Sequence, residues 1–361
     1  MKDKLVTLIL LTTVVLSGCS AAKEGDPSTD TQVTELTETT ASATTSETAA
    51  TVPETSETTT VTTAQEKFEF NPHVHVKIMD KWTSPDYWDS FYNLCDALRE
   101  GRDTFECSSK EAYEWCLDDV TMGSLFPAAS MTVCGKSDDG SVPFEDGIGR
   151  IYYKVPPEEV VARQKDFEGV IEDIINTYVD KDDNDFEKCI KLYNYVESNY
   201  TYGELELSDT EGYFYKCIME KKGICSDISA AYAYLLMQVE VDAISVGCFD
   251  NMDHAWTYLV IDGQGYHSDP TWALQSGTYM EHLDLDYFLM TDEERTESGC
   301  PVTDLTVGLY PAFWIKDTDI ELSAASTKYE ALGHAVLDRL DVENKIIYFW
   351  DADEPKEFCY K

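Results

Sequence analysis

Gly223-Ile224-Cys225-Ser226-Asp227 is followed downstream by Asp253-His254-Ala255-Trp256 and then by His267-Ser268-Asp269-Pro270-Thr271-Trp272. A cysteine, a histidine and an aspartate are the groups of a nucleophilic triad. In such a triad the histidine activates the thiol and the aspartate orients the histidine. Cys225, His254 and Asp269 can form this site if the surrounding elements bring them together.

The residues after Cys225 have the pattern of a buried helix. Apolar side chains recur at helical spacing, at Ile228, Ala231, Tyr232, Leu235 and Leu236. Ser226 and Asp227 are typical of a first helical turn, so we expect Cys225 at the N-terminus of this helix. The helix dipole there lowers the pKa of a thiol, and backbone N–H groups at the same end can stabilise an oxyanion.

The other two motifs flank a predicted hairpin. Asp262-Gly263, a strong signal for a two-residue turn, separates two strand-like runs, 256–261 and 266–269. If Ile261 faces Gln264, Asp269 lies one diagonal step from His254 on the same face of the sheet. Such neighbours are roughly 7–8 Å apart, within reach of long side chains, so the geometry permits a triad.

Each candidate also has an ordinary structural interpretation. Cys225 could be a buried structural thiol, His254 a hydrogen-bonded core residue, and Asp269 the first residue of an Asp-Pro turn. Two further residues are weaker candidates: Tyr215 for a hydroxyl at the oxyanion and His267 for lining the site. A zinc site is the alternative chemistry, but these ligands lack the close paired spacing of common zinc sites, so we expect no metal.

The three motifs together resemble the transglutaminase-like superfamily of papain-type cysteine enzymes. The similarity lies in Gly-x-Cys at a helix start, His-Ala-Trp on a strand and Asp-Pro-Thr-Trp after the next strand. Residues 215–220 and 287–294 also resemble family segments, and the close likeness covers roughly 185–295. The resemblance implies an α+β fold with a papain-like core, in which the nucleophile's helix packs on an antiparallel sheet.

The resemblance also implies acyl transfer through a thioester on Cys225, without a cofactor. Water as the acceptor gives a protease or deamidase, whereas a lysine amine gives a transglutaminase, and the motifs do not distinguish these outcomes. Bacterial relatives favour hydrolysis. The alternative from another class is a surface binding module that keeps the fold without catalysis.

The N-terminus has the features of a lipoprotein signal. Lys2 and Lys4 precede a short apolar run, 5–16, and Leu16-Ser17-Gly18-Cys19 resembles a bacterial lipoprotein processing box. This resemblance implies cleavage before Cys19, lipidation of its thiol and anchoring on the outer face of a membrane. An ordinary secretory signal is the alternative.

Composition separates a linker from the folded part. Residues 20–66 are rich in Thr, Ser and Glu, so we expect a disordered spacer.

The whole chain has 27 Lys and Arg against 69 Asp and Glu, a formal net charge of −42. This charge argues against nucleic acid and anionic lipid as partners. A peptide or protein at the cell surface is the expected substrate, and the oligomeric state is open.

The folded part is expected to have three regions: an α-rich region at 67–165, the transglutaminase-like domain at 166–315 and a C-terminal extension at 316–361. Helices are predicted at 87–98, 112–117 and 329–340, with a loop at 122–143 and strands at 149–155 and 345–350. Asp180 to Asp185 superficially suggests a calcium loop, but Asn184 and Glu187 fit a helix capping box better. Besides Cys19 and Cys225, the nine other cysteines are expected to be mostly free thiols.

Overall fold

The computed structural model describes residues 66–81, 83–137, 140–248, 253–276, 283–302, 305–307 and 322–361. All of them belong to one compact unit, Gln65–Lys361. The predicted signal segment, Cys19 and nearly all of the predicted linker lie outside the described residues. Within the described ranges, no helix has the length and apolar character needed to cross a membrane.

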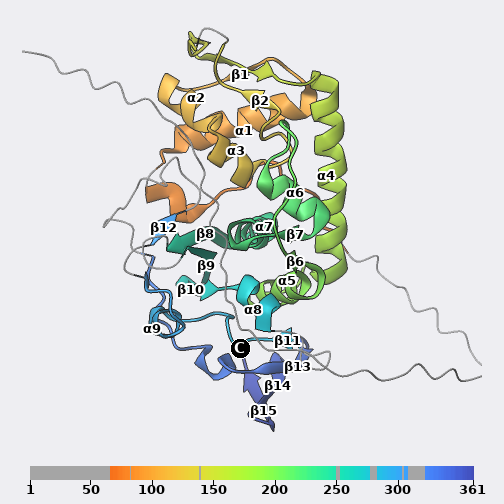
Figure 1. Cartoon of the computed structure of the whole chain (residues 1–361), viewed down its shortest axis with the longest axis vertical. Helices are drawn as coiled ribbons and strands as arrows, with labels where there is room; N and C mark the ends of the chain where they lie inside the picture. Colours follow the sequence, from red (N-terminus) through yellow and green to blue (C-terminus); the bar gives the residue numbers. More distant parts are fainter. Residues whose placement is uncertain are drawn as a thin grey trace, which may run out of the picture. The chain divides into compact units, whose positions relative to one another are not determined.

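The N-terminal region is built mainly from helices and contains short strands (Figure 1). The helix predicted at 87–98 extends over Pro85–Glu100, and Gly101 directly after it is in the left-handed conformation at φ 70°. The helix predicted at 112–117 spans Lys110–Cys116, and the Ser109 side chain caps it by accepting a hydrogen bond from the Ala112 amide. The elements are η1 Lys77–Lys81, α1 Pro85–Glu100, β1 Thr104–Glu106, α2 Lys110–Cys116, α3 Asp119–Leu125, β2 Val133–Cys134, β3 Phe144–Glu145, β4 Ile148–Arg150, β5 Tyr152–Tyr153 and α4 Pro157–Tyr178.

Two expectations for this region were only partly right. The stretch 122–143 was predicted as loop, yet it includes the end of α3 and the strand β2. The predicted strand at 149–155 is interrupted at Ile151, because β4 pairs with β1 and β3 whereas β5 pairs with β2. These short pairings depend on partners distant in the sequence, so local pattern did not reveal them.

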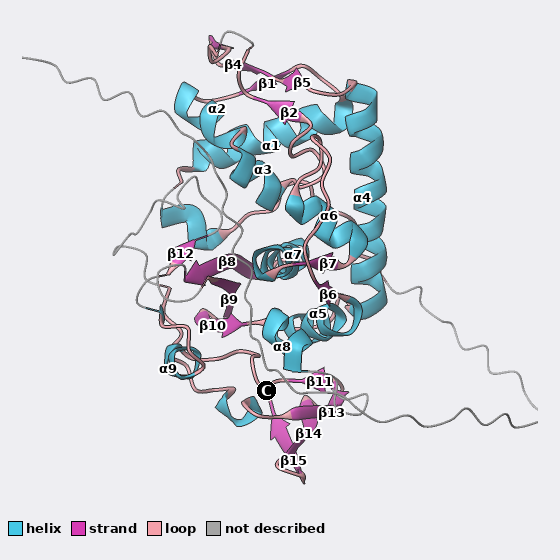
Figure 2. Cartoon of the chain, in the orientation of Figure 1, coloured by secondary structure: helices cyan, strands magenta, loops and turns pink. Residues whose placement is uncertain are grey.

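The central region consists of an antiparallel sheet and the helix α7, which packs on its strands β8 and β9 (Figures 1 and 2). The strand order is β10-β9-β8-β12, and every residue of α7 except Ser226 is buried. The elements are α5 Asp185–Asn199, β6 Thr201–Tyr202, α6 Tyr213–Glu220, β7 Lys222–Gly223, α7 Cys225–Gln238, β8 Asp242–Cys248, β9 His254–Ile261, β10 Gln264–Ser268, α8 Pro270–Ser276 and β12 Thr306–Val307. The mixed helices and antiparallel sheet confirm the α+β fold class.

The C-terminal strands form a second sheet, of order β11-β13-β14-β15, separate from the central one. The predicted strand at 345–350 is confirmed as β14. The predicted helix at 329–340 is wrong: only a short 3-10 turn forms there, and the chain then pairs with β14 as a strand. The elements are β11 Leu283–Asp284, α9 Asp292–Glu297, η3 Glu330–Leu332, β13 Val336–Asp341, β14 Ile346–Asp351 and β15 Glu354–Cys359.

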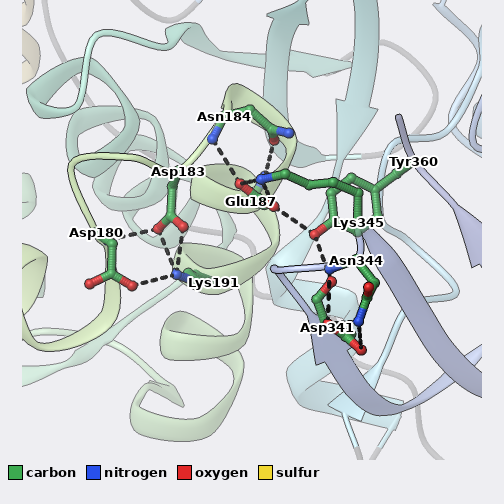
Figure 3. A network of polar contacts seen from close by, with 9 residues as sticks. All are labelled: Asp180, Asp183, Asn184, Glu187, Lys191, Asp341, Asn344, Lys345 and Tyr360. Carbon is green, nitrogen blue, oxygen red and sulfur yellow. Dashed lines mark hydrogen bonds and ion pairs between the residues drawn. The ribbon is translucent and has the colours of Figure 1, made fainter.

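Glu187 connects this second sheet to the start of α5 (Figure 3). Its carboxylate accepts a hydrogen bond from the Asn184 amide at 2.9 Å, while the Asn184 side chain accepts one from the Glu187 amide at 3.0 Å. This reciprocal pair is the predicted capping box. The same carboxylate accepts hydrogen bonds from Lys345 at 2.7 Å and Tyr360 at 2.6 Å. One buried carboxylate therefore both starts α5 and holds the C-terminal strands.

Candidate active site

Cys225 is the first residue of α7, as the sequence predicted. The Asp227 carboxylate accepts a hydrogen bond from the Ile224 amide at 3.1 Å, which closes the first turn around the cysteine. The preceding Gly223 is tightly enclosed. A Cβ atom there would lie 2.7 Å from the Asp227 Cβ and 2.9 Å from the Cys217 sulfur. The glycine of the Gly-x-Cys motif is thus required by close packing beneath the turn that holds Cys225.

The packing of α7 sets the position of Cys225 relative to the sheet. Helix α7 ends just before β8 begins, so the two elements run antiparallel and the start of α7 lies at the end of β8. One turn after Cys225, Ser229 hydrogen bonds to the Ser245 hydroxyl at 2.7 Å and accepts a bond from the Thr257 hydroxyl at 2.9 Å. Since β9 begins at His254, Cys225 and His254 lie at the same end of this helix–sheet layer.

His254 and Asp269 form a direct hydrogen bond. His254 Nε2 lies 2.6 Å from Asp269 Oδ2, and the two side chains are 4% and 0% exposed. The predicted hairpin register holds, with Ile261 opposite Gln264. Strand β10 ends at Ser268 and α8 begins at Pro270, so Asp269 lies at the junction between the two elements. With Nε2 bonded to the carboxylate, Nδ1 is the nitrogen of His254 left for base chemistry.

Two tryptophans of the motifs hold the histidine in position. The His254 ring stacks on Trp272, with centroids 4.6 Å apart and planes inclined by 14°. Trp256 lies on the same sheet face, with its ring centroid 6.2 Å from that of His254. The Trp272 amide also donates a hydrogen bond of 3.2 Å to Asp269 Oδ1. The tryptophans therefore fix the orientation of the histidine, and their aromatic faces exclude water from it.

Arg295, in α9, is a site residue that sequence reasoning missed. Its guanidinium Nη1 lies 3.0 Å from Asp269 Oδ2, and both side chains are fully buried. The guanidinium carbon lies over the rings of Trp256, at 4.1 Å, and Trp272, at 4.3 Å. An arginine late in a short, highly charged helix has the sequence signature of a solvent-exposed residue. Only its position directly after the family-like segment 287–294 could have pointed to it.

The charge of Asp269 is stabilised by its neighbours. Complete burial opposes ionisation, but His254 and Arg295 outweigh this effect and hold the pKa of Asp269 below its usual range. A carboxylate that stays ionised can stabilise the imidazolium that forms when a histidine accepts a proton. The His254–Asp269–Arg295 arrangement thus has the electrostatics of the orienting half of a triad.

His267 is engaged entirely with the protein. Its Nδ1 accepts a hydrogen bond from Trp256 Nε1 at 3.0 Å, and its Nε2 lies 2.9 Å from Asp292 Oδ1. The side chain is fully buried, and this burial lowers the pKa of the imidazole in spite of Asp292. His267 thus holds the Trp256 ring through a hydrogen bond, and neither imidazole nitrogen of His267 is available to a substrate.

Tyr215, the second weaker candidate, lies on α6 and packs toward α4. Its ring centroid is 5.8 Å from that of Phe167, and the Arg163 guanidinium lies 5.4 Å above the ring. Partial burial raises the pKa of its hydroxyl. A neutral phenol is the form able to donate a hydrogen bond to an oxyanion.

As for metals, no group of three or more His, Cys, Asp or Glu in the described ranges is arranged to hold an ion.

The sequence of this region matches a known protein family. Residues 172–270, which include Cys225, His254 and Asp269, match the sequence pattern of the Transglutaminase-like superfamily. The fold is also similar to part of the crystal structure of a proposed cysteine protease from Cytophaga hutchinsonii, at 17% sequence identity and a TM-score of 0.24. That match covers 29% of this chain and 37% of the other. A comparison with curated proteins gives no match. Residues 172–270 therefore form a domain of the transglutaminase-like superfamily.

Proposed function

We propose that this protein is an exported, lipid-anchored cysteine enzyme that cleaves or transfers acyl groups of peptide or protein amides. One observation carries the proposal: the buried His254–Asp269 hydrogen bond of 2.6 Å lies at the end of the sheet where Cys225 begins α7. A histidine with only a structural role does not need an ionised carboxylate as its partner. Here the carboxylate of Asp269 is ionised, and its charge is balanced in turn by the buried guanidinium of Arg295. Burying these charges costs free energy, and a catalytic role explains why the arrangement is present.

In the proposed mechanism, His254 Nδ1 accepts the Cys225 proton and the thiolate attacks the amide carbonyl carbon. Backbone N–H groups of the first turn of α7 stabilise the tetrahedral oxyanion. The intermediate collapses to a thioester as the imidazolium protonates the leaving amine. Water then attacks the thioester to give an acid, or a primary amine attacks it to give a new amide, and Cys225 is restored. Hydrolysis is the favoured outcome.

Acyl-enzyme trapping tests this proposal. The purified full chain is incubated with p-nitrophenyl acetate, quenched in acid and digested, and each cysteine peptide is analysed by mass spectrometry. The acetyl group is expected on Cys225, with roughly 100-fold less in His254→Ala, since general base catalysis contributes about 10²–10⁴-fold. A primary amine should shorten the lifetime of the adduct. Equal acetylation of Cys225 in the two proteins, or none, would contradict the mechanism.

A second candidate function is binding without catalysis, on the same fold. The observation in its favour is the limited access to the triad residues: Cys225, His254 and Asp269 are only 8%, 3% and 0% exposed. A binding module predicts a slow, unactivated Cys225 thiol. The enzyme proposal instead requires that substrate reach Cys225, and acetylation of that residue distinguishes the two.

Localisation is a separate part of the proposal, supported by the sequence Leu16-Ser17-Gly18-Cys19 after a short apolar run. Lipidation of Cys19 would hold the enzyme on the outer face of the cell membrane, near peptide and protein substrates. In a bacterial host, the full chain should take up radiolabelled fatty acid and fractionate with membranes. Cys19→Ala should remove the label, and a labelled Cys19→Ala protein would refute anchoring at this residue.

A further inference from the structure

His267 and Asp292 form a second histidine–aspartate pair, outside the proposed triad. His267, in β10, lies opposite Tyr258 of β9, and Trp256 is the next residue of β9 on the same sheet face. His267 Nε2 lies 2.9 Å from Oδ1 of Asp292, the first residue of α9. The His267 side chain is fully buried, whereas that of Asp292 is 33% exposed. The pair therefore connects the protein surface to the tryptophan of the His-Ala-Trp motif.

The partners of His267 define its protonation state. An indole N–H can only donate a hydrogen bond, so the 3.0 Å bond from Trp256 Nε1 requires an unprotonated Nδ1 on His267. An ionised carboxylate can only accept, so the Nε2 that faces Asp292 carries the proton. A second proton, on Nδ1, would remove the acceptor that Trp256 uses. Burial lowers the pKa of His267 and the charge of Arg295 adds to this effect, although Asp292 opposes it, so the neutral form is favoured.

Asp292 is itself held in place by a later segment of the chain. Its Oδ2 accepts a hydrogen bond from the Ala324 amide at 3.1 Å, and its own amide donates one of 2.8 Å to the Ala324 carbonyl oxygen. Partial burial opposes ionisation of Asp292, but hydrogen bonds from His267 and Ala324 outweigh this effect and lower its pKa. The Tyr258 ring, with its centroid 5.5 Å from that of His267, donates its hydroxyl to the Ser323 carbonyl oxygen at 3.0 Å. Residues 323–324 therefore fix both Asp292 and the tyrosine beside His267.

Trp256 connects this pair to the proposed triad. The Arg295 guanidinium carbon lies 4.1 Å from the centre of its ring, and Arg295 Nη1 lies 3.0 Å from Asp269 Oδ2. The same carboxylate oxygen lies 2.6 Å from His254 Nε2. A buried N–H without an acceptor is unfavourable. Without the acceptor on His267, the indole would therefore turn toward another acceptor and displace the guanidinium that stacks on it.

We propose that His267 and Asp292 are positioning residues of the proposed enzyme. Through the indole of Trp256 they hold Arg295 in place, and Arg295 in turn holds the carboxylate that orients the catalytic histidine. His267 transfers no proton and touches no substrate in this role, since both of its nitrogens bind protein groups. The proposal rests on the function proposed above, because only an activated Cys225 needs such positioning.

Two replacements of His267 separate the roles of its two nitrogens. His267→Asn places an amide oxygen near the position of Nδ1 and so keeps an acceptor for Trp256. His267→Gln places an amide nitrogen near the position of Nε2, which keeps the donor to Asp292 but loses that acceptor. Tyr266→Phe is the matched control, because it removes the hydrogen bond of another buried side chain, 2.8 Å to Ser326, on the other face of the same strand.

The rate of Cys225 alkylation by iodoacetamide is measured in the full chain by peptide mass spectrometry, at about pH 6 and about pH 9. Most of an ordinary thiol is ionised near pH 9, so the rate there reports folding and access, and the ratio of the two rates reports activation. This ratio should fall roughly 10-fold in His267→Gln and stay within about 3-fold of wild type in His267→Asn and Tyr266→Phe.

Trp256→Phe completes the test, since it removes the indole N–H but keeps an aromatic face for Arg295. The ratio should fall in this variant too, and adding His267→Gln should lower it by less than about 2-fold further. A wild-type ratio in Trp256→Phe or in His267→Gln, or an equal loss in His267→Asn and His267→Gln, would overturn the positioning role while activation of wild-type Cys225 stands. A wild-type Cys225 without activation would overturn the proposed function and this proposal together.

Discussion

Arg295 Nη1 lies 3.0 Å from Asp269 Oδ2, the same oxygen that binds His254. The guanidinium is clamped between the faces of Trp256 and Trp272, which also flank His254. One arginine therefore links the carboxylate, the histidine and both motif tryptophans. In the proposed enzyme Arg295 is a positioning residue: it acts through Asp269 and touches no substrate.

Replacement of Arg295 tests this role. Arg295→Met leaves a buried carboxylate without its cation, and we expect a loss of about 3–5 kcal/mol in the free energy of unfolding, measured with urea. Arg295→Lys keeps the charge but not the planar stacking, so the protein should fold while the pH profile of Cys225 alkylation shifts. Arg339→Met is the control, because the Arg339 guanidinium also stacks on an aromatic ring, that of Tyr348, but its side chain is exposed. This substitution should lower the free energy of unfolding by less than about 1 kcal/mol. An unchanged Cys225 profile in Arg295→Lys would leave Arg295 a purely structural role.

Two glycine-to-alanine substitutions should have opposite effects. At Gly223 a Cβ would collide with Asp227 and Cys217, so we expect a loss of about 1–3 kcal/mol in stability and slower alkylation of Cys225. Gly169, in α4, has no atom within 4 Å of an added Cβ. Gly169→Ala should therefore stabilise the protein by about 0.5–1 kcal/mol and leave Cys225 unchanged. Thermal unfolding with parallel alkylation measures both, and equal stability of the two variants would contradict the tight turn at Gly223.

The raised pKa of the buried Glu197 carboxyl predicts that the stability of the protein changes with pH. Burial raises its pKa to about 8, while its Oε1 accepts a hydrogen bond from the Asp284 amide at 2.8 Å. A raised pKa means that the folded state holds the proton more tightly, so the contribution of Glu197 is largest below the unfolded pKa of about 4.3. It then falls as pH rises toward 8 and is constant above that.

Glu197→Gln keeps the acceptor but cannot ionise. Relative to wild type, this variant should gain on the order of a few kcal/mol between about pH 5 and pH 8. Urea unfolding at several pH values measures this difference. Glu172→Gln is a control, because Glu172 accepts a hydrogen bond from the Phe70 amide in a less buried place. A pH-independent difference between Glu197→Gln and wild type would contradict the assignment.

The core of the site could be predicted because its signals are local. The turn at Asp262-Gly263 fixed the register of Ile261 and Gln264, and the polar first turn after Cys225 marked the start of α7. Arg295 could not be predicted, because its burial depends on tryptophans from two other elements. A hydrophobic pattern alone does not indicate which charged side chain they enclose.

The wrong helix at 329–340 has a similar cause. The backbone of His334 is in the left-handed region, at φ 67°, which breaks any continuous helix there. From Val336 onward the chain pairs with β14, whose Trp350 lies opposite Val336 and whose Phe349 lies opposite Leu337. The apolar spacing that suggested a helix is satisfied instead by a turn followed by a strand. The deciding interactions come from a strand later in the chain.

The central claim is that His254 activates Cys225. Its most direct test is the rate of iodoacetamide alkylation of Cys225 between about pH 4 and pH 9, followed by peptide mass spectrometry in wild type and His254→Ala. Rapid alkylation near pH 6 in wild type, absent from the variant, is the predicted result. Slow alkylation in both proteins, rising only above about pH 8 as for an ordinary thiol, would contradict the account and favour a binding module.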